Sequence, residues 1–250
     1  MNMIRILSKI LLSLLLTAAV LPAAMAQADE TAEVTAIRAF LSVNQPNIEV
    51  QGIEPSPIAG LYQVNIQNGR TIFVSNDARF LLPGDLYEAT EEGLVNLGED
   101  HRRIVRKEKI AAIDESEMIT FAARGEQKYV MTVFTDVDCP YCRKLHGDMD
   151  ALNNAGITVR YLAFPRTGLD TNEYRKMVST WCSENRVAML TSAERGGDVP
   201  EADCDNPVAE HYALGREVGV TGTPALVLED GSILIGYRAA EDLIPGLLGE

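Results

Sequence analysis

The stretch that decides the fold is Val133-Phe134-Thr135-Asp136-Val137-Asp138-Cys139-Pro140-Tyr141-Cys142-Arg143-Lys144-Leu145-His146. The apolar run from Tyr129 to Phe134 just before the cysteines predicts a buried strand. Behind them, Leu145, Met149 and Leu152 recur at helical spacing. The two cysteines are therefore expected where a strand leads into the first turn of a helix.

This position suits redox chemistry. Free N–H groups and the positive end of the helix dipole stabilise a thiolate at Cys139, which predicts a lowered pKa for Cys139 and not for Cys142. Asp136 and Asp138 act in the opposite direction and are expected to limit the shift. A thiol of low pKa is a nucleophile at neutral pH and a good leaving group. Cys142, one turn further on, is placed to attack a mixed disulfide at Cys139.

Two other interpretations of the pair are weaker. A zinc site normally has a second cysteine pair or nearby histidines, and His146 is the only histidine near these cysteines. An inert structural disulfide would close a very short loop, which removes little entropy from the unfolded chain.

A second signal lies downstream, in Val220-Thr221-Gly222-Thr223-Pro224-Ala225-Leu226-Val227-Leu228. Pro224 opens an apolar run, and proline is tolerated at the start of a strand. Together with the upstream pattern, Thr223-Pro224 resembles the cis-proline loop of the thioredoxin superfamily, which implies a cis bond packed beside Cys139. The alternative is an ordinary proline before an edge strand.

The N-terminus predicts export. Residues 1–26 have a positive start, an apolar core and the cleavage signature Ala24-Met25-Ala26, so the mature chain is expected to begin at Gln27. The apolar core is short for a membrane span and no later stretch qualifies, so no membrane insertion is expected. The periplasm is then the expected location, where disulfides persist.

Charge limits the classes of partner. The net charge is −14, and removing Arg5 and Lys9 with the signal segment takes the mature chain to −16. This excess of acid argues against nucleic acid and against anionic membrane surfaces.

Residues 27–90 form a cysteine-free first unit. A short helix is expected over residues 32–43, and the alternation in residues 62–67 predicts a half-buried strand. Asn68-Gly69 then predicts a hairpin to Thr71-Ile72-Phe73-Val74. A unit this small has little core of its own, and a second copy of the chain is the simplest way to cover its strand edges.

Residues 91–115 are charged and include the basic block 101–109. Helical spacing of the apolar residues predicts a linker helix. The block is either a docking patch for an acidic partner or, as we favour, part of a solvated helix.

The remainder, residues 116–250, predicts a thioredoxin-like α/β unit with a helical insertion. Besides the first strand and helix, the expected elements are a strand over 157–164, helices over 171–190 and 207–218, strands over 225–228 and 232–235, and a closing helix over 240–248.

Several segments together resemble the DsbC/DsbG family of periplasmic thiol:disulfide isomerases. They are Val133-Phe134-Thr135-Asp136, Cys139-Pro140-Tyr141-Cys142, residues 156–166, His211-Tyr212-Ala213-Leu214-Gly215 and Gly222-Thr223-Pro224-Ala225. The resemblance implies an α+β dimerisation domain at 27–90, a helical linker at 91–115 and an α/β thioredoxin-like catalytic domain with a helical insertion at 116–250. It also implies a homodimer, misfolded disulfide-containing secreted proteins as substrates and a membrane reductase of the DsbD type as partner. It implies no cofactor and no metal.

The resemblance also implies roles for single residues. Cys139 is the exposed nucleophile and Cys142 the resolving thiol, while Thr223 and Pro224 form the substrate-binding loop. Cys182 and Cys204 match the family's structural disulfide. Pro140 and Tyr141 lie between the cysteines as in DsbG, and the resemblance implies that these two residues tune the reduction potential.

Other functions stay open at this stage: a DsbG-like reductase of oxidised single cysteines, a net oxidase, and a holdase chaperone that binds unfolded chains through apolar surface. The first unit argues against a lone oxidase, which does not need a dimerisation unit.

Overall fold

The computed structural model of the chain describes residues 31–67, 69–91 and 93–249. The predicted signal segment, residues 1–26, lies outside the described residues.

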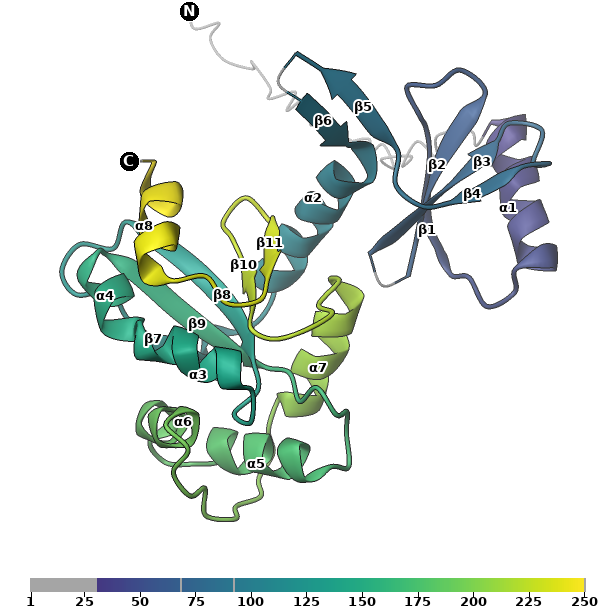
Figure 1. Cartoon of the computed structure of the whole chain (residues 1–250). Coiled ribbons are helices and arrows are strands. Elements are labelled where there is room, and N and C mark those ends of the chain that lie inside the picture. Colours follow the sequence, from purple (N-terminus) through teal and green to yellow (C-terminus); the bar gives the residue numbers. More distant parts are fainter. Residues whose placement is uncertain (1–30, 68, 92, 250) are drawn as a thin grey trace, which may run out of the picture. The chain divides into compact units, whose positions relative to one another are not determined.

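The first unit is a four-stranded antiparallel sheet with a helix on one face (Figure 1). Its elements are α1 (Ala32–Asn44), β1 (Val50–Pro55), β2 (Leu61–Ile66), β3 (Arg70–Ser75) and β4 (Leu81–Pro83), and the strands lie in chain order. Ile37 and Leu41 of α1 pack on the apolar side chains of the sheet, such as Val64. The predicted helix and the predicted β2–β3 hairpin are both confirmed.

The prediction of a half-buried β2 is wrong. Gln63 and Asn65, expected on a solvated face, are buried. The Gln63 amide donates to Asn65 Oδ1 at 3.2 Å, and the Thr71 hydroxyl donates to the same oxygen at 3.2 Å. Because buried polar groups are stable when they bond to one another, polar residues in the pattern did not mark a solvent-facing side here.

The predicted linker helix begins later than expected. Strands β5 (Tyr87–Thr90) and β6 (Gly93–Asn96) form a hairpin that the sequence analysis missed. Helix α2 (Leu97–Ala111) starts only after Asn96, whose side chain accepts from the Gly98 N–H at 3.0 Å. An asparagine cap of this kind fixes the start of a helix more firmly than the spacing of its apolar residues does.

The basic block lies on a helix and is solvated only in part: Lys107 is exposed, but the favoured interpretation is wrong for Arg106. Arg106 is only 2 % exposed, and its guanidinium donates to the carbonyl of Val218 at 2.9 Å and to that of Gly231. Arg103 pairs with Asp230 at 2.6 Å. These positive charges hold α2 against the second unit of the same chain, which begins after it.

The second unit, which follows α2, is built on a five-stranded mixed sheet in the order β11-β10-β8-β9-β7. The strands are β7 (Ile119–Phe121), β8 (Tyr129–Thr135), β9 (Ile157–Ala163), β10 (Ala225–Val227) and β11 (Ile233–Ile235). Strands β8 and β9 are parallel, and the other pairs are antiparallel. The edge strand β7 was not predicted, and the other four strands were.

Helices cover both faces of this sheet. They are α3 (Pro140–Gly147), α4 (Met149–Asn154), α5 (Asn172–Trp181), α6 (Arg186–Glu194), α7 (Val208–Glu217) and α8 (Ala240–Leu248). One core joins the sheet to α3, α4, α5, α6 and α8, with Leu145 and Trp181 fully buried in it. The second core, around Phe134, lies on the other side and is covered by Tyr212 of α7 and Ile110 of α2.

Two predicted helices are interrupted. The single helix expected over 171–190 is two helices, because α5 ends at Trp181 and α6 restarts after Asn185, whose side chain accepts from the Ala188 N–H. The helix behind the cysteines likewise breaks at Asp148, between α3 and α4. Among the helices of the described residues, none has the length and apolarity to cross a membrane.

Candidate active site

The two cysteines lie at the end of β8, where the chain turns into α3. The Cys139 N–H donates to the Asp136 carbonyl at 2.9 Å, which closes the turn after the strand. Cys139 has extended backbone angles and is the N-cap residue of α3, and Pro140 takes the first helical position. Proline is favoured there because its missing N–H would have had no partner within the helix.

The environment separates the two thiols. Hydrogen bonding from the Cys142 thiol is the largest effect that lowers the pKa of Cys139, to about 5, and the backbone N–H groups of Tyr141 and Cys142 act in the same direction. Burial raises the pKa of Cys142, and hydrogen bonding to Cys139 raises it further. Both directions agree with the sequence prediction. The largest cause is the second thiol, however, while the prediction rested on the helix N-terminus alone.

The second predicted motif lies directly against the first. The Thr223–Pro224 peptide bond is cis, and the Thr223 carbonyl oxygen is 3.3 Å from Cys139 Sγ. Strand β10 begins at Ala225 and pairs with β8 at Phe134, which brings the loop beside the N-terminus of α3. The structure therefore brings together four residues singled out in the sequence, Cys139, Cys142, Thr223 and Pro224.

The expectation that Cys139 is exposed is wrong for this structure. Its relative exposure is 1 %, the same as that of Cys142, because the cis-proline loop and the second thiol cover its sulfur. Tyr141, between the cysteines, is 56 % exposed and marks the position of the site on the surface.

The aspartates near the thiols are neutralised by basic partners. Asp136 is fully buried, and its Oδ2 accepts from the Arg166 backbone N–H at 3.0 Å and from Arg166 Nε at 2.9 Å. Asp138 pairs with Lys176 at 2.8 Å. The sequence analysis treated both aspartates as free charges, because it had no way to place Arg166 or Lys176 beside them.

The sequence analysis also missed Glu194, at the end of α6. Glu194 directly precedes Arg195-Gly196-Gly197, and an acidic residue in this position is typical of an exposed helix end. Its side chain is nevertheless buried and accepts from the Thr135 hydroxyl at 2.8 Å. No sequence signal distinguishes it from the exposed acids of the same insertion.

The other two cysteines form a disulfide away from the thiol pair. Cys182 directly follows α5 and is bonded to Cys204 in the loop before α7, with their Cα atoms 5.7 Å apart. Ser179 reinforces the same connection, because its hydroxyl donates to the Ala202 carbonyl and accepts from the Ala202 N–H. The bridge closes the insertion that contains α6.

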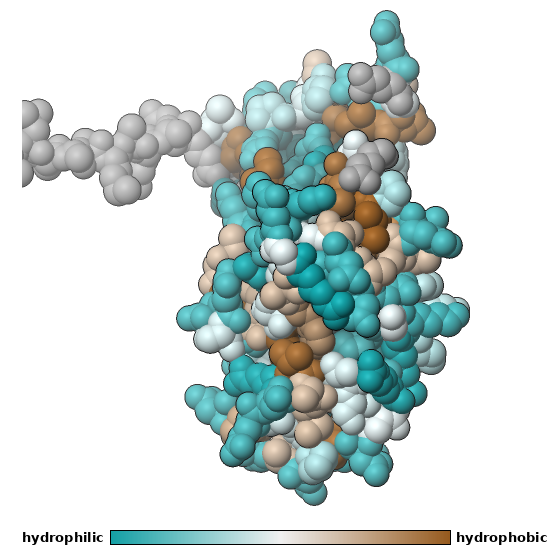
Figure 2. All heavy atoms as spheres, turned by 90° about the vertical axis from the view of Figure 1, so that its left-hand side faces the viewer, coloured by the Kyte–Doolittle hydropathy of each residue, from teal (hydrophilic) through white to brown (hydrophobic). Residues whose placement is uncertain are grey.

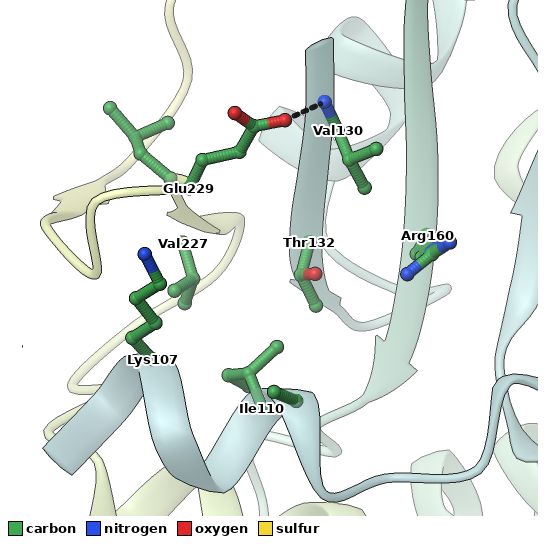
Figure 3. A pocket seen from close by; sticks show the side chains of 9 residues that line it. Lys107, Ile110, Val130, Thr132, Arg160, Val227 and Glu229 are labelled. Atoms are coloured by element: carbon green, nitrogen blue, oxygen red, sulfur yellow. Dashed lines mark hydrogen bonds between the residues drawn. The ribbon is translucent and has the colours of Figure 1, made fainter. Parts of the chain in front are cut away.

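A pocket of about 320 Å³ lies elsewhere, between α2 and the sheet. Figure 3 shows the side chains of Ile110, Thr132 and Val227 around it, with Glu229 accepting a hydrogen bond from the Val130 N–H. Neither Cys139 nor Cys142 lines this pocket, so it is separate from the thiol chemistry.

Known families match both parts of the chain. The thioredoxin-like domain family matches residues 115–247, and the family described as the disulfide bond isomerase protein N-terminal domain matches residues 23–99. The thiol:disulfide interchange protein DsbC of Escherichia coli K12 is 38 % identical over 196 residues, which cover 78 % of this chain and 80 % of that protein. The chain belongs to the DsbC family.

Other DsbC relatives extend the match. DsbC of Haemophilus influenzae is 36 % identical over 225 residues, covering 90 % of this chain and 93 % of that protein. A solved structure, the disulfide interchange protein from Neisseria gonorrhoeae, is 33 % identical and covers 55 % of this chain and all of that one, with a TM-score of 0.49. The predicted fold class, a DsbC N-terminal domain followed by a thioredoxin-like domain, is confirmed. As a DsbC-family member, the protein is an enzyme of thiol:disulfide interchange.

Proposed function

We propose that this DsbC-family protein isomerises wrong disulfides in secreted proteins in the periplasm, with Cys139 as nucleophile and Cys142 as resolving thiol. The observation that carries the proposal is the position of Cys139 at a helix N-terminus, 3.3 Å from the carbonyl oxygen of the cis-proline loop. Hydrogen bonding from Cys142 lowers the pKa of Cys139 there to about 5. At neutral pH such a thiol is present as thiolate, which is the form that attacks a disulfide.

The reaction begins when the Cys139 thiolate attacks a substrate disulfide and releases one substrate thiolate. The resulting mixed disulfide has two exits. A substrate thiol attacks it and completes an isomerisation, or Cys142 attacks it and releases the substrate reduced. The second exit leaves Cys139 and Cys142 oxidised, so a reductase of the DsbD type is required to restore the dithiol.

The first unit supports a homodimer. Exposed apolar side chains gather at its edge strand β4 and on the hairpin that follows: Phe80 and Leu82 at β4, Tyr87 on β5, and Leu94 and Val95 on β6. Figure 2 shows hydrophobic surface as separate patches on one face of the molecule. Unpaired strand edges with exposed apolar side chains associate readily, and a second copy of the chain fits them by symmetry. Two thiol sites in one dimer would hold a misfolded chain while its disulfides are rearranged.

Refolding of scrambled multi-disulfide ribonuclease tests the proposed chemistry. Cys139→Ala should abolish the recovery of ribonuclease activity, because no mixed disulfide forms. Cys142→Ala should keep part of the isomerisation but lose net reduction, and it should accumulate mixed disulfides with the substrate. Recovery by Cys139→Ala at the rate of the unaltered protein would contradict the proposal.

Sedimentation tests the dimer. Leu94→Glu places a charge on the most exposed apolar residue of the β5–β6 hairpin, at 73 % exposure, and should halve the mass in solution. The matched control is Val43→Glu, at the equally exposed end of α1, which should leave the mass unchanged. Equal masses for both variants would show that this hairpin is not part of the interface.

The same apolar surface favours a second activity, a holdase that shields unfolded chains. The double variant Cys139→Ala/Cys142→Ala separates the two: aggregation of a reduced client should still be suppressed if the surface acts alone. The Pro140-Tyr141 pair also keeps a DsbG-like reductase of oxidised single cysteines as the alternative redox function.

A further inference from the structure

The pocket between α2 and the sheet has no part in the thiol exchange, yet a charged side chain lies in it. Arg160 of β9 is paired across the sheet with Thr132 of β8, and Thr132 is paired in turn with Val227 of β10. Paired residues of neighbouring strands point to the same face of a sheet, so these three side chains form one row (Figure 3). The row places a cation, a hydroxyl and an apolar group side by side in the lining of the pocket.

Two residues further along the same strands, this face of the sheet is apolar. The corresponding row there is Ala225, Phe134 and Leu162, and all three side chains are fully buried. Arg160 and Thr132 therefore interrupt an apolar face. A polar or charged group in such a place destabilises the fold unless its donors find partners.

The protein itself satisfies Arg160 only in part. Its Nη2 pairs with Glu115 Oε1 at 2.5 Å, and the Glu115 side chain is 68 % exposed. An ion pair with so exposed a carboxylate contributes little to stability. The Nε of Arg160 is buried and has no hydrogen-bond partner among the described residues. A positively charged donor is thus left for a ligand.

A second cation lines the pocket from α2. Lys107 makes no ion pair with another described residue, whereas Lys109, two residues later, pairs with Glu217 at 2.8 Å. The acid in the lining is Glu229, whose Oε1 already accepts from the Val130 N–H at 2.8 Å. Two cations against one carboxylate give the lining a net positive charge, which favours an anion.

The rest of the lining is apolar. It consists of Ile110 and Ala111 from α2 and of Val130, Val227 and Leu228 from the sheet side. The volume of about 320 Å³ is at the small end of the range for pockets that bind small molecules, about 300–1,000 Å³. Such a pocket fits a ligand with one anionic end and a short apolar body.

We propose that this pocket binds a small amphiphilic carboxylate, of the chemical class of the medium-chain fatty acids. The carboxylate accepts hydrogen bonds from Arg160 Nε and from the Thr132 hydroxyl, and Lys107 adds electrostatic attraction. The apolar chain packs against Ile110 and Val227. The proposal does not depend on the thiol exchange, because neither active-site cysteine lines the pocket.

The strands below the pocket offer no partners to a polypeptide backbone. Strand β8 lies between β10 and β9 and is paired on both sides, and the N–H of Val130 is taken by Glu229. A peptide in the pocket would bury its own N–H and C=O groups without partners, which is unfavourable. A fatty acid has no such groups, so the occupant is a small molecule and not a client chain.

Binding has a consequence for the linker helix. The ligand contacts Lys107 and Ile110 on α2 and, at the same time, Thr132 and Arg160 on the sheet. Because the complete site exists only while α2 lies against the sheet, the ligand stabilises that contact by mass action. The midpoint of thermal unfolding should therefore rise with the ligand concentration.

Methyl-resolved NMR of the full-length mature protein, titrated with sodium octanoate, tests the site. The methyl signals of Ile110, Val130, Val227 and Leu228 should shift together and saturate with a Kd of about 0.1–1 mM, as expected for a ligand of about ten non-hydrogen atoms. The neutral analogue 1-octanol should bind at least about tenfold more weakly, because it lacks the charge. No saturable shift up to about 10 mM octanoate, or equal affinity for octanol, overturns the proposal.

Arg160→Gln removes the buried donor and should weaken octanoate binding at least about tenfold. The matched control is Arg124→Gln, at an exposed arginine that also pairs with an acid, Asp150. The control lies outside the pocket lining and should leave the Kd unchanged. Equal Kd values for the two variants overturn the proposal.

Changes at Thr132 keep the test decisive if Arg160→Gln folds poorly. Thr132→Val removes the hydroxyl at similar volume and should weaken octanoate binding about three- to tenfold, whereas Thr132→Ser should stay within about twofold of the unaltered protein. Lys107→Gln should weaken it about two- to fivefold, and Lys128→Gln, an exposed lysine outside the pocket, should not change it. Equal affinities of the Val and Ser variants overturn the proposal.

A short acetylated peptide that ends in leucine separates the two sources of this chemistry. It offers a carboxylate and an apolar side chain together with a peptide backbone, and it should bind at least about tenfold more weakly than octanoate. Equal or tighter binding would assign the pocket to protein C-termini and overturn the small-molecule proposal. Refolding of scrambled ribonuclease tests the proposed function separately, so a failure of one proposal is distinguishable from a failure of the other.

Discussion

Replacing both cysteines of the Cys182–Cys204 bridge by alanine is expected to lower the free energy of unfolding by about 3.4 kcal/mol. The two residues are 22 positions apart, and the chain-entropy relation gives this value for a loop of that length. The substitution also removes little packing, because the loop at Cys204 is exposed.

Urea unfolding followed by Trp181 fluorescence measures the loss, since Trp181 is fully buried at the end of α5, next to the bridge. The comparison is best made with alanine at Cys139 and Cys142 in both proteins, so that no thiol exchange takes place during unfolding. The midpoint should fall at an unchanged slope. A loss below about 1 kcal/mol would refute the reasoning, because it would mean that the unfolded insertion stays compact without its covalent link.

Two further changes are expected to have clear outcomes. In a thermal melt, Gly215→Ala should lower the free energy of unfolding by about 1–3 kcal/mol, because its Cβ would lie 2.5 Å from the Phe164 ring. The control is Gly246→Ala in α8, whose Cβ would meet nothing within 4 Å and which should not lower the free energy of unfolding. The rate of Cys139 alkylation by iodoacetamide should stay high above about pH 5 and fall below it, since the thiolate is lost as the pH drops through the lowered pKa. In Cys142→Ala that midpoint should move upward, because the largest cause of the lowered pKa is gone; an unmoved midpoint would assign the effect to the helix N-terminus.

The assembly of the thiol pair and the cis-proline loop could be predicted because its signals are local. A buried strand, two cysteines and a helix follow one another directly, and Pro224 opens a strand that pairs with that first strand. Each feature depends on a short stretch of sequence. The parallel pairing of β8 with β9 and the antiparallel pairing of β10 with β8 then follow from the order of the elements.

The parts that could not be predicted depend on contacts between distant segments. Asn65 was expected to face solvent, yet it is buried, and its side-chain oxygen accepts from Gln63 and Thr71. Glu194 has the sequence pattern of an exposed helix end. It is buried because the end of α6 packs against Thr135, at the end of β8 before the thiols. The burial of Cys139 likewise depends on a loop 84 residues away.

The contact between Arg106 and the turn at Gly231 bears on where this protein can be cut. Sequence similarity places the start of the thioredoxin-like domain at residue 115. A fragment that begins there lacks Arg106, the hydrogen-bond donor to the carbonyls of Val218 and Gly231. It also lacks Ile110, which covers part of the core around Phe134. Gly231 admits no side chain, because its Cβ would lie 2.0 Å from the Arg103 carbonyl oxygen. We therefore expect a fragment that begins before Leu97, and so keeps the whole of α2 with Arg106 and Ile110, to be more stable than a fragment that begins at residue 115.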